Sequence, residues 1–364
     1  MRDSTTRSPA MPPDDMRAAR GNAFLRRWLF VMAGLVFGMV VVGGATRLTG
    51  SGLSITEWRP IMGAIPPLTA QEWADAFAKY QAIPQYELLN KGMSFVEFQT
   101  IFWWEWSHRQ LGRLIGLVFA AGFVTSLWLG ALRGRRALGV LGIGALGGVQ
   151  AMIGWIMVAS GLKEGMVAVA PIKLMLHLTM AAVIFTLLVM VATRLAPKAD
   201  EGAPRGIKRD GVILLLLTLL QIALGALVAG SKAGMTWNTW PLIDGHFIPP
   251  AEMLFSVVPW IENFVDNAAL VQFNHRMSAY ALLIFAVWHW WQVKRVMPGT
   301  GASRRATINA VLVVAQAGIG IATLLAIVPL WLALLHQAFA FVVLGMAAAH
   351  VGALYRARPV ADQR

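Results

Sequence analysis

Four histidines stand at comparable places in four long apolar segments of the chain: His108, His177, His275 and His336. The first lies in the motif Glu-Trp-Ser-His-Arg (105–109), and the third lies in the related motif Gln-Phe-Asn-His-Arg (272–276). Polar or ionisable groups within a membrane segment are costly, so their presence indicates a function. Two imidazoles that face each other in a helical bundle can bind a haem iron from both sides. The four histidines therefore predict two bis-histidine haem sites.

The histidines are in register with an internal repeat. Gly-Ser, His-Arg, Gln-x-x-x-Gly and Leu-His elements recur in the same order, offset by 159 to 180 residues: 50–51, 108–109, 150–154 and 176–177 match 230–231, 275–276, 316–320 and 335–336. An even number of spans per unit makes such a repeat parallel, with its axis along the membrane normal. Four unrelated, locally hydrogen-bonded histidines are the simpler alternative, and the shared register disfavours it. Zinc is a weaker alternative, because carboxylate and thiolate co-ligands are scarce.

Composition places most of the chain in lipid. Of 364 residues 57% are hydrophobic and 13% charged, with a mean hydropathy of +0.61, whereas soluble proteins carry about 25% charged residues. The absence of cysteine excludes disulfides, iron–sulfur clusters, c-type haem and thiolate nucleophiles. Eight apolar segments reach the roughly 20 residues needed to span a bilayer: about 24–45, 107–132, 136–160, 170–193, 211–230, 270–293, 306–328 and 330–354.

Basic residues predict the orientation of these spans. Of the 31 Lys and Arg residues, 21 lie in the two tails and in alternate connections, all on one side. The positive-inside rule therefore predicts that both termini are cytoplasmic. The net charge of +13 forms no basic stripe with interleaved aromatic residues, so we expect no nucleic-acid partner. The apolar run that begins near Phe24 is too long for a signal-peptide core and is expected to remain as an anchor.

These features predict an all-α polytopic membrane protein with eight transmembrane helices in two pseudo-twofold-related four-helix bundles. The N-terminal bundle covers 24–195, with a long outer loop at 46–106, and the C-terminal bundle covers 211–355. Cytoplasmic segments make up the remainder, namely a disordered tail at 1–23, a linker at 196–210 and a tail at 356–364.

The first outer loop contains a predicted helix. Thr69 and Glu72 have the spacing of a capping box, and Trp73, Phe77 and Tyr80 then fall on one helical face. This helix can either lie on the membrane surface or pack outside the membrane. A second capping box at 94–97 predicts that the second span begins well outside the lipid.

The two halves differ beside the histidines. Glu105 lies three residues before His108, on the same helical face, whereas Gln272 lies three residues before His275. A carboxylate near a haem edge can accept protons or stabilise a developing cation, and an amide can do neither. The first bundle is therefore predicted to be the reactive site and the second an electron-transfer site. A solvated Glu105 at the membrane interface remains the alternative.

Two arginines directly follow the first histidine of each pair. Arg109 and Arg276 can pair with haem propionates, or they can extend to lipid headgroups. Two further histidines, His289 and His350, lie 14 residues beyond His275 and His336. That spacing could serve a second, inner haem, but the Trp-rich surroundings of His289 favour an interfacial aromatic belt.

Four stretches resemble the haem A synthase family. They are Gly-Gly-Ala-Thr-Arg-Leu-Thr-Gly-Ser-Gly-Leu-Ser-Ile-Thr-Glu-Trp-Arg-Pro at 43–60, the motif at 105–109, Trp-Asn-Thr-Trp-Pro at 237–241 and Asp-Asn-Ala-Ala-Leu-Val-Gln-Phe-Asn-His-Arg at 266–276. The resemblance covers about residues 24–355. Some members of this family carry a cysteine pair in the first outer loop. This chain carries none and is similar to the cysteine-free, proteobacterial-type subgroup.

The resemblance implies oxidation of the C8 methyl group of haem O to a formyl group, with water as the oxygen source, to give haem A for terminal oxidases. It implies that substrate haem binds between His108 and His177, that Glu105 is essential, and that a haem b (iron) cofactor binds between His275 and His336. It also implies a bacterial inner-membrane location, membrane lipid as the surroundings, and haem O synthase and an electron acceptor as partners. Homo-oligomerisation stays open.

Two other functions agree with the same residues. A membrane b-type cytochrome could pass electrons to or from quinone without altering haem, and it would hold its haems permanently. A haem carrier for oxidase assembly would exchange haem but form no new pigment. The pigment made in the presence of haem O distinguishes all three.

Overall fold

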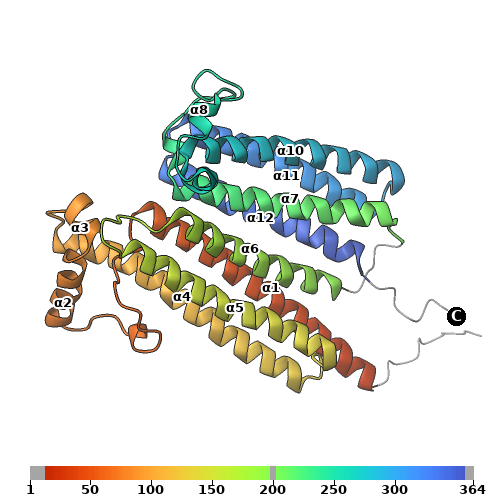
Figure 1. The fold of residues 1–364 in the computed structure, drawn as a ribbon. Coiled ribbons are helices and arrows are strands. Elements are labelled where there is room, and N and C mark those ends of the chain that lie inside the picture. The colour runs from red at the N-terminus through yellow and green to blue at the C-terminus, as the bar shows by residue number, and fades with distance from the viewer. Residues whose placement is uncertain (1–12, 197–201, 357–364) are drawn as a thin grey trace, which may run out of the picture.

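Eight long helices make up most of the protein. The computed structural model describes residues 13–196 and 202–356, and its long helices run side by side in two groups (Figure 1). Their bounds are α1 (Pro13–Leu48), α4 (Phe95–Trp128), α5 (Gly134–Gly161), α6 (Pro171–Arg194), α7 (Arg205–Gly230), α10 (Ala268–Val296), α11 (Gly301–Leu325) and α12 (Leu330–Leu354). Among the described residues no strand forms, and the fold is all-α as predicted.

Short helices lie in the two long connections. The first connection holds η1 (Met62–Ala64), α2 (Ala70–Gln81) and α3 (Pro84–Leu89), and the second holds η2 (Ala233–Met235), α8 (Ala251–Leu254), η3 (Trp260–Glu262) and α9 (Asn263–Asp266). Figure 1 shows α2, α3 and α8 at the same end of the long helices.

Among the described residues, seven helices are long and apolar enough to cross a membrane, namely α1 from Ala19, α4, α5, α6, α7, α11 and α12. The chain is thus a multi-pass membrane protein. The predicted sixth span, at 270–293, corresponds to α10 and does not reach the same apolarity. Its outer half contains the polar motif Gln-Phe-Asn-His-Arg at 272–276, its inner half contains His289, and these residues lower its hydropathy.

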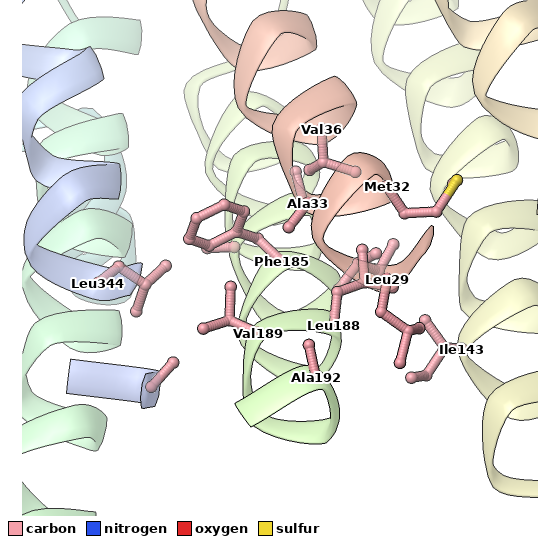
Figure 2. Packing of buried hydrophobic residues seen from close by; sticks show 14 of the residues in the cluster. Leu29, Met32, Ala33, Val36, Ile143, Phe185, Leu188, Val189, Ala192 and Leu344 are labelled. Carbon is pink, nitrogen blue, oxygen red and sulfur yellow. The ribbon is translucent and has the colours of Figure 1, made fainter. Parts of the chain in front are cut away.

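The long helices pack in two groups that have the same pattern of contacts. In the first group α1 contacts α4 and α6, and α5 contacts α4 and α6; in the second group α7 contacts α10 and α12, and α11 contacts α10 and α12. The groups meet where α1 and α6 pack against α7 and α12. At this junction the rings of Phe185 on α6 and Phe341 on α12 lie 5.4 Å apart between centroids. Figure 2 shows Leu29 and Met32 of α1 beside Leu188 of α6 in the buried cluster.

The outer-loop helix α2 packs outside the membrane span and against α4. Both predicted capping boxes form, at Thr69 with Glu72 and at Ser94 with Glu97. The apolar face of α2 then meets the first turns of α4, where ring centroids of Phe77 and Phe98 lie 4.9 Å apart. Since this face is covered by protein, the packed alternative is the one that the structure adopts.

Helix α1 begins earlier than the sequence predicts. It starts at Pro13 rather than near residue 24, so the predicted disorder of the tail is wrong from residue 13 onward. Proline is favoured at the first position of a helix, and no proline interrupts the chain between residues 14 and 48. The rest of that tail (1–12), part of the linker (197–201) and most of the C-terminal tail (357–364) lie outside the described residues.

Candidate functional site

Glu105 is buried in α4 with both carboxylate oxygens engaged. Its Oε2 accepts hydrogen bonds from the Ser54 hydroxyl and from the main-chain N–H of Ile55, each at 2.8 Å. Its Oε1 accepts from two guanidinium nitrogens of Arg109, at 2.6 and 3.1 Å. The residue is only 3% exposed. The solvated alternative for Glu105 is therefore wrong, because the outer loop folds over this side chain and supplies two of its donors.

Arg109 joins the same loop to α4. In addition to the ion pair with Glu105, its guanidinium donates to the carbonyls of Ile55 at 2.7 Å and Glu57 at 2.8 Å. Charge-assisted bonds of this kind are roughly twice as strong as neutral ones. Arg109 thus positions the loop and the carboxylate together. These four bonds are not those of a side chain extended toward lipid headgroups, and the predicted contact with a haem propionate stays a prediction.

The second half repeats this arrangement without the charge. Gln272 donates to the carbonyl of Ala233 at 2.7 Å, and its amide oxygen accepts from Arg276 at 2.7 Å. Arg276 also donates to the carbonyl of Leu242 at 3.1 Å. An i,i+4 pair with an arginine therefore holds an outer loop in both halves. The difference is a buried carboxylate in one and a buried amide in the other.

The four predicted histidines lie two in each group of helices. His108 of α4 and His177 of α6 belong to the first group, and His275 of α10 and His336 of α12 belong to the second; we call them the outer pairs. All four rings are half-buried. Each is faced by a glycine of a neighbouring helix, at which an added methyl group would lie within 2.8–3.0 Å of the ring: Gly43, Gly154, Gly225 and Gly320 respectively. These glycines make room for each imidazole beside the adjacent helix.

Three of the histidines contact a glutamine that the sequence places four residues before the facing glycine. Gln150, Gln221 and Gln316 donate to the main-chain carbonyls of His177, His275 and His336, at 3.1, 3.1 and 3.0 Å. The same amide nitrogens lie 3.0–3.2 Å from Nδ1 of the rings. The repeat at 150–154 and 316–320 was visible in the sequence, but its contact with histidine was not. Gln221 was missed, although it has the same Gln-x-x-x-Gly spacing.

Helix α1 has two adjacent glycines, Gly43 and Gly44, where other helices approach it closely. A methyl group on Gly43 would meet His108 at 3.0 Å, and one on Gly44 would meet the amide of Gln337 at 2.6 Å. Gln337 follows His336 and donates to the carbonyl of Val40 at 2.6 Å. Two glycines in succession thus let side chains of α4 and α12 approach α1 closely at adjacent positions.

The inner histidines form a different kind of pair. His289 and His350 are both 0% exposed, and their Nε2 atoms lie 3.0 Å apart in a direct hydrogen bond. Each ring thus uses its Nε2 atom to contact the other ring. The alternative of an inner haem, which the sequence already disfavours, gains no support from this direct contact. Nor does His289 join the interfacial belt, because it faces the protein interior while Trp291 is exposed.

The surroundings of the outer histidine pairs agree with haem binding and add no support for the zinc alternative. Each outer pair offers two half-buried imidazoles on diagonally placed helices of one group, and the amide oxygens of Gln150, Gln221 and Gln316 are buried beside them without a partner. Within the described part of the chain, no three His, Asp or Glu side chains gather in a way that could hold a metal ion. Bis-imidazole ligation of a haem needs no further side-chain donor.

The sequence matches a known family along most of its length. The profile of the COX15-CtaA family, described as cytochrome oxidase assembly protein, matches residues 26–348. The chain is 60% identical over 347 residues to a protein of Methylobacterium sp. (strain 4-46) named heme A synthase, covering 95% of this chain and 96% of that protein. A protein of Mesorhizobium japonicum with the same name is 51% identical over 336 residues, covering 92% and 91%. The chain belongs to the COX15-CtaA family of cytochrome oxidase assembly proteins.

Proposed function

We propose that the protein is a haem A synthase that oxidises the C8 methyl group of haem O to a formyl group. The observation that carries the proposal is a buried carboxylate, Glu105, one helical turn from His108. The names of its relatives support the same activity. With water as the oxygen source, the methyl group and one water give the formyl group, four protons and four electrons.

In this proposal the substrate haem lies between His108 and His177, and Glu105 acts on its edge. Positive charge develops near the methyl carbon as electrons leave, and a fixed carboxylate stabilises that charge. The same group can accept a proton as the C–H bonds break. Ser54, Ile55 and Arg109 hold the carboxylate in one orientation before the reaction begins. Such preorganised groups lower a barrier because they need not reorient during the reaction.

The second bundle would hold haem b through His275 and His336, and bound there it supplies one-electron transfer. Neutral Gln272 stands where the first bundle has its carboxylate. The Gly43–Gly44 step supports passage of electrons between the bundles, because α1 is contacted there by His108 at Gly43 and, at Gly44, by Gln337, the residue that follows His336. An acceptor outside this chain would then remove the electrons. The bundle boundaries 24–195 and 211–355 are part of the same proposal.

Proposed membrane placement includes α10 as an eighth span, with both termini in the cytoplasm of a bacterial inner membrane. The helix has 29 residues and packs between α7 and α11, and at 1.5 Å per residue its length exceeds a bilayer core of about 30 Å. Reporter domains fused after Arg135 or Arg205 should be active only inside, and those fused after Gln81 or Gly245 only outside. An external signal at Arg205 would break the eight-span arrangement.

The activity is tested by extracting pigments from cells that make haem O and express this chain. Haem A in the extract supports the synthase. Two permanently bound haems with no haem A would favour an electron-transferring b-type cytochrome instead. Haem O that binds and exchanges without chemical change would favour a haem carrier. The variant His108→Ala, which removes one substrate ligand, is the matched control and should give no haem A.

A further inference from the structure

Three of the four outer histidines are held by what we call a glutamine brace. In each brace the glutamine amide donates to the main-chain carbonyl of the histidine and also touches its ring. At His177 and His275 the amide nitrogen lies nearly equally far from both ring nitrogens, at 3.2 and 3.3 Å and at 3.0 and 3.3 Å. It therefore lies against the ring rather than along one lone pair, and it restricts how the imidazole can turn.

The fourth histidine, His108, has no brace. Its facing glycine is Gly43, and the residue four positions earlier is Met39 instead of glutamine. The Met39 methyl group approaches α4 near Gly112, where an added methyl would lie 3.3 Å from it. Across the described ranges, the His108 ring makes no side-chain hydrogen bond. The residue beside His108 is thus apolar, whereas the corresponding residue beside each of the other three histidines is a glutamine.

The unbraced position lies in the bundle where haem must come and go. A substrate haem enters and a product haem leaves with every turnover, whereas a resident haem stays. A partner that fixes the orientation of a ligating histidine typically raises metal affinity about 10–100-fold. Lack of such a partner at one ligand gives a site whose iron bond opens more readily, while a brace on the other ligand, His177, keeps the haem in place.

We propose that the three glutamine braces decide which axial ligand opens, and that His108, which Met39 leaves unbraced, is the ligand that releases iron during haem exchange. This inference rests on the proposed function, since it takes the first bundle as the substrate site. Gln150, Gln221 and Gln316 are then positioning residues that act through their histidines, and Met39 is the position that makes the first site exchangeable.

The test measures how fast each haem leaves the purified full-length protein. Protein from cells that supply haem O is mixed with excess apomyoglobin, and the pigments that transfer are identified by chromatography. Wild-type protein should release the haem of the first bundle (haem O or haem A) faster than haem b. Met39→Gln should slow that release about 10–100-fold and leave haem b unchanged, whereas Met39→Leu, which adds no amide, should change neither rate.

The reverse substitution, Gln221→Met, should speed the loss of haem b about 10–100-fold without changing release from the first bundle. Equal release rates for Met39→Gln and Met39→Leu would overturn the proposal.

Carbon monoxide binding to the reduced wild-type protein gives an independent test that needs no variant to fold. Carbon monoxide should bind at the first-bundle haem faster than at haem b, and the opposite order would contradict the proposal. Haem release can be measured whether or not haem A forms. Failure of the proposed activity, seen as no haem A in the pigment extract, is therefore distinguished from failure of this inference, seen as unchanged release rates.

Discussion

In the first bundle an ion pair fastens the outer loop to its helix, whereas in the second bundle a neutral amide and an arginine do the same. Arg109 bonds to Glu105 and to loop carbonyls, and Arg276 bonds to Gln272 and to loop carbonyls. The second bundle therefore shows that an amide is sufficient to hold such a loop. Burying a charge is costly even when it is paired. The negative charge of Glu105 must accordingly serve something other than loop attachment, and chemistry at the adjacent haem edge is the role we assign to it.

The largest effect is expected from the histidines of the second bundle. Changing His275 or His336 to Ala removes one of two axial ligands and should abolish the low-spin haem b spectrum of the purified protein. Changing His108 or His177 to Ala should leave that spectrum in place, because those residues belong to the other site. Loss of haem b on replacing His108 or His177, with retention on replacing His275 or His336, would reverse the assignment of the halves.

A smaller effect is expected at the arginines. Lysine cannot reproduce the forked contacts of Arg109 with Glu105 and two carbonyls. Arg109→Lys should lower haem A formation about 10–100-fold, because a displacement near 1 Å at a reacting site can have an effect of this size. The matched change Arg276→Lys should lower haem A formation clearly less, since no reacting group lies beside Gln272. The measurement is the haem A yield per haem b, and equal losses would argue against a special role for the first loop.

The inner histidine pair should matter for stability and not for haem content. His350→Leu leaves the Nε2 atom of buried His289 without its partner, and an unsatisfied buried polar group costs about 1–3 kcal/mol. The thermal midpoint of the detergent-solubilised protein should fall by a few degrees while its haem b content stays constant. A variant that loses haem in proportion would show that this pair binds haem after all.

The smallest effect concerns pH in the first outer loop. The Lys79 ammonium, hydrogen-bonded at 2.8 Å, lowers the pKa of Glu57, with added Coulombic help from Lys79 and Arg59. A carboxyl whose pKa is lower when folded contributes stability above its unfolded pKa, about 4.3, and loses it as pH falls through the folded pKa. Both side chains are partly exposed, so the pair contributes only about 0–1 kcal/mol.

Acidification from pH 6 to pH 3 should therefore slightly lower the protection factors of residues 57–81, that is, their amide exchange relative to an unstructured chain at the same pH. The Lys79→Ala variant should already show the lower protection factors at pH 6 and respond less to acid. If the variant and the wild-type protein respond to acid alike, the Glu57–Lys79 pair does not stabilise this loop.

Sequence patterns predicted the helices and their repeat order better than the contacts between distant residues. The two His-Arg motifs and the repeat order predicted two histidine pairs, and capping-box spacing predicted the starts of α2 and α4. These features depend on residues close together along the chain. Apolarity alone does not establish α10 as a span, because the polar motif at 272–276 and His289 lower the hydropathy of a helix that is otherwise long enough.

Contacts between distant residues could not be predicted in this way. Burial of Glu105 depends on Ser54 and Ile55, about fifty residues earlier, in a loop whose path no local pattern determines. The braces depend on which face of one helix meets the next. Gln221 was overlooked because its counterpart in the first half is Met39, so the internal repeat is broken at the position where the two sites differ.

The most direct test of the division between the bundles is the haem composition of Glu105→Gln, which copies the second bundle into the first. The amide oxygen can accept from Arg109, as Gln272 does from Arg276, and the NH2 group can donate to the Ser54 hydroxyl, while the bond from the Ile55 N–H is lost. The protein should therefore still fold and retain haem b. Loss of one charge contact in the transition state typically lowers a rate about 10²–10³-fold, and extracts should therefore contain haem O in place of haem A. Gln272→Glu, the matched change in the other bundle, should leave the haem A yield unchanged. Haem A formation by Glu105→Gln at the wild-type rate would remove the carboxylate from the mechanism and contradict the account.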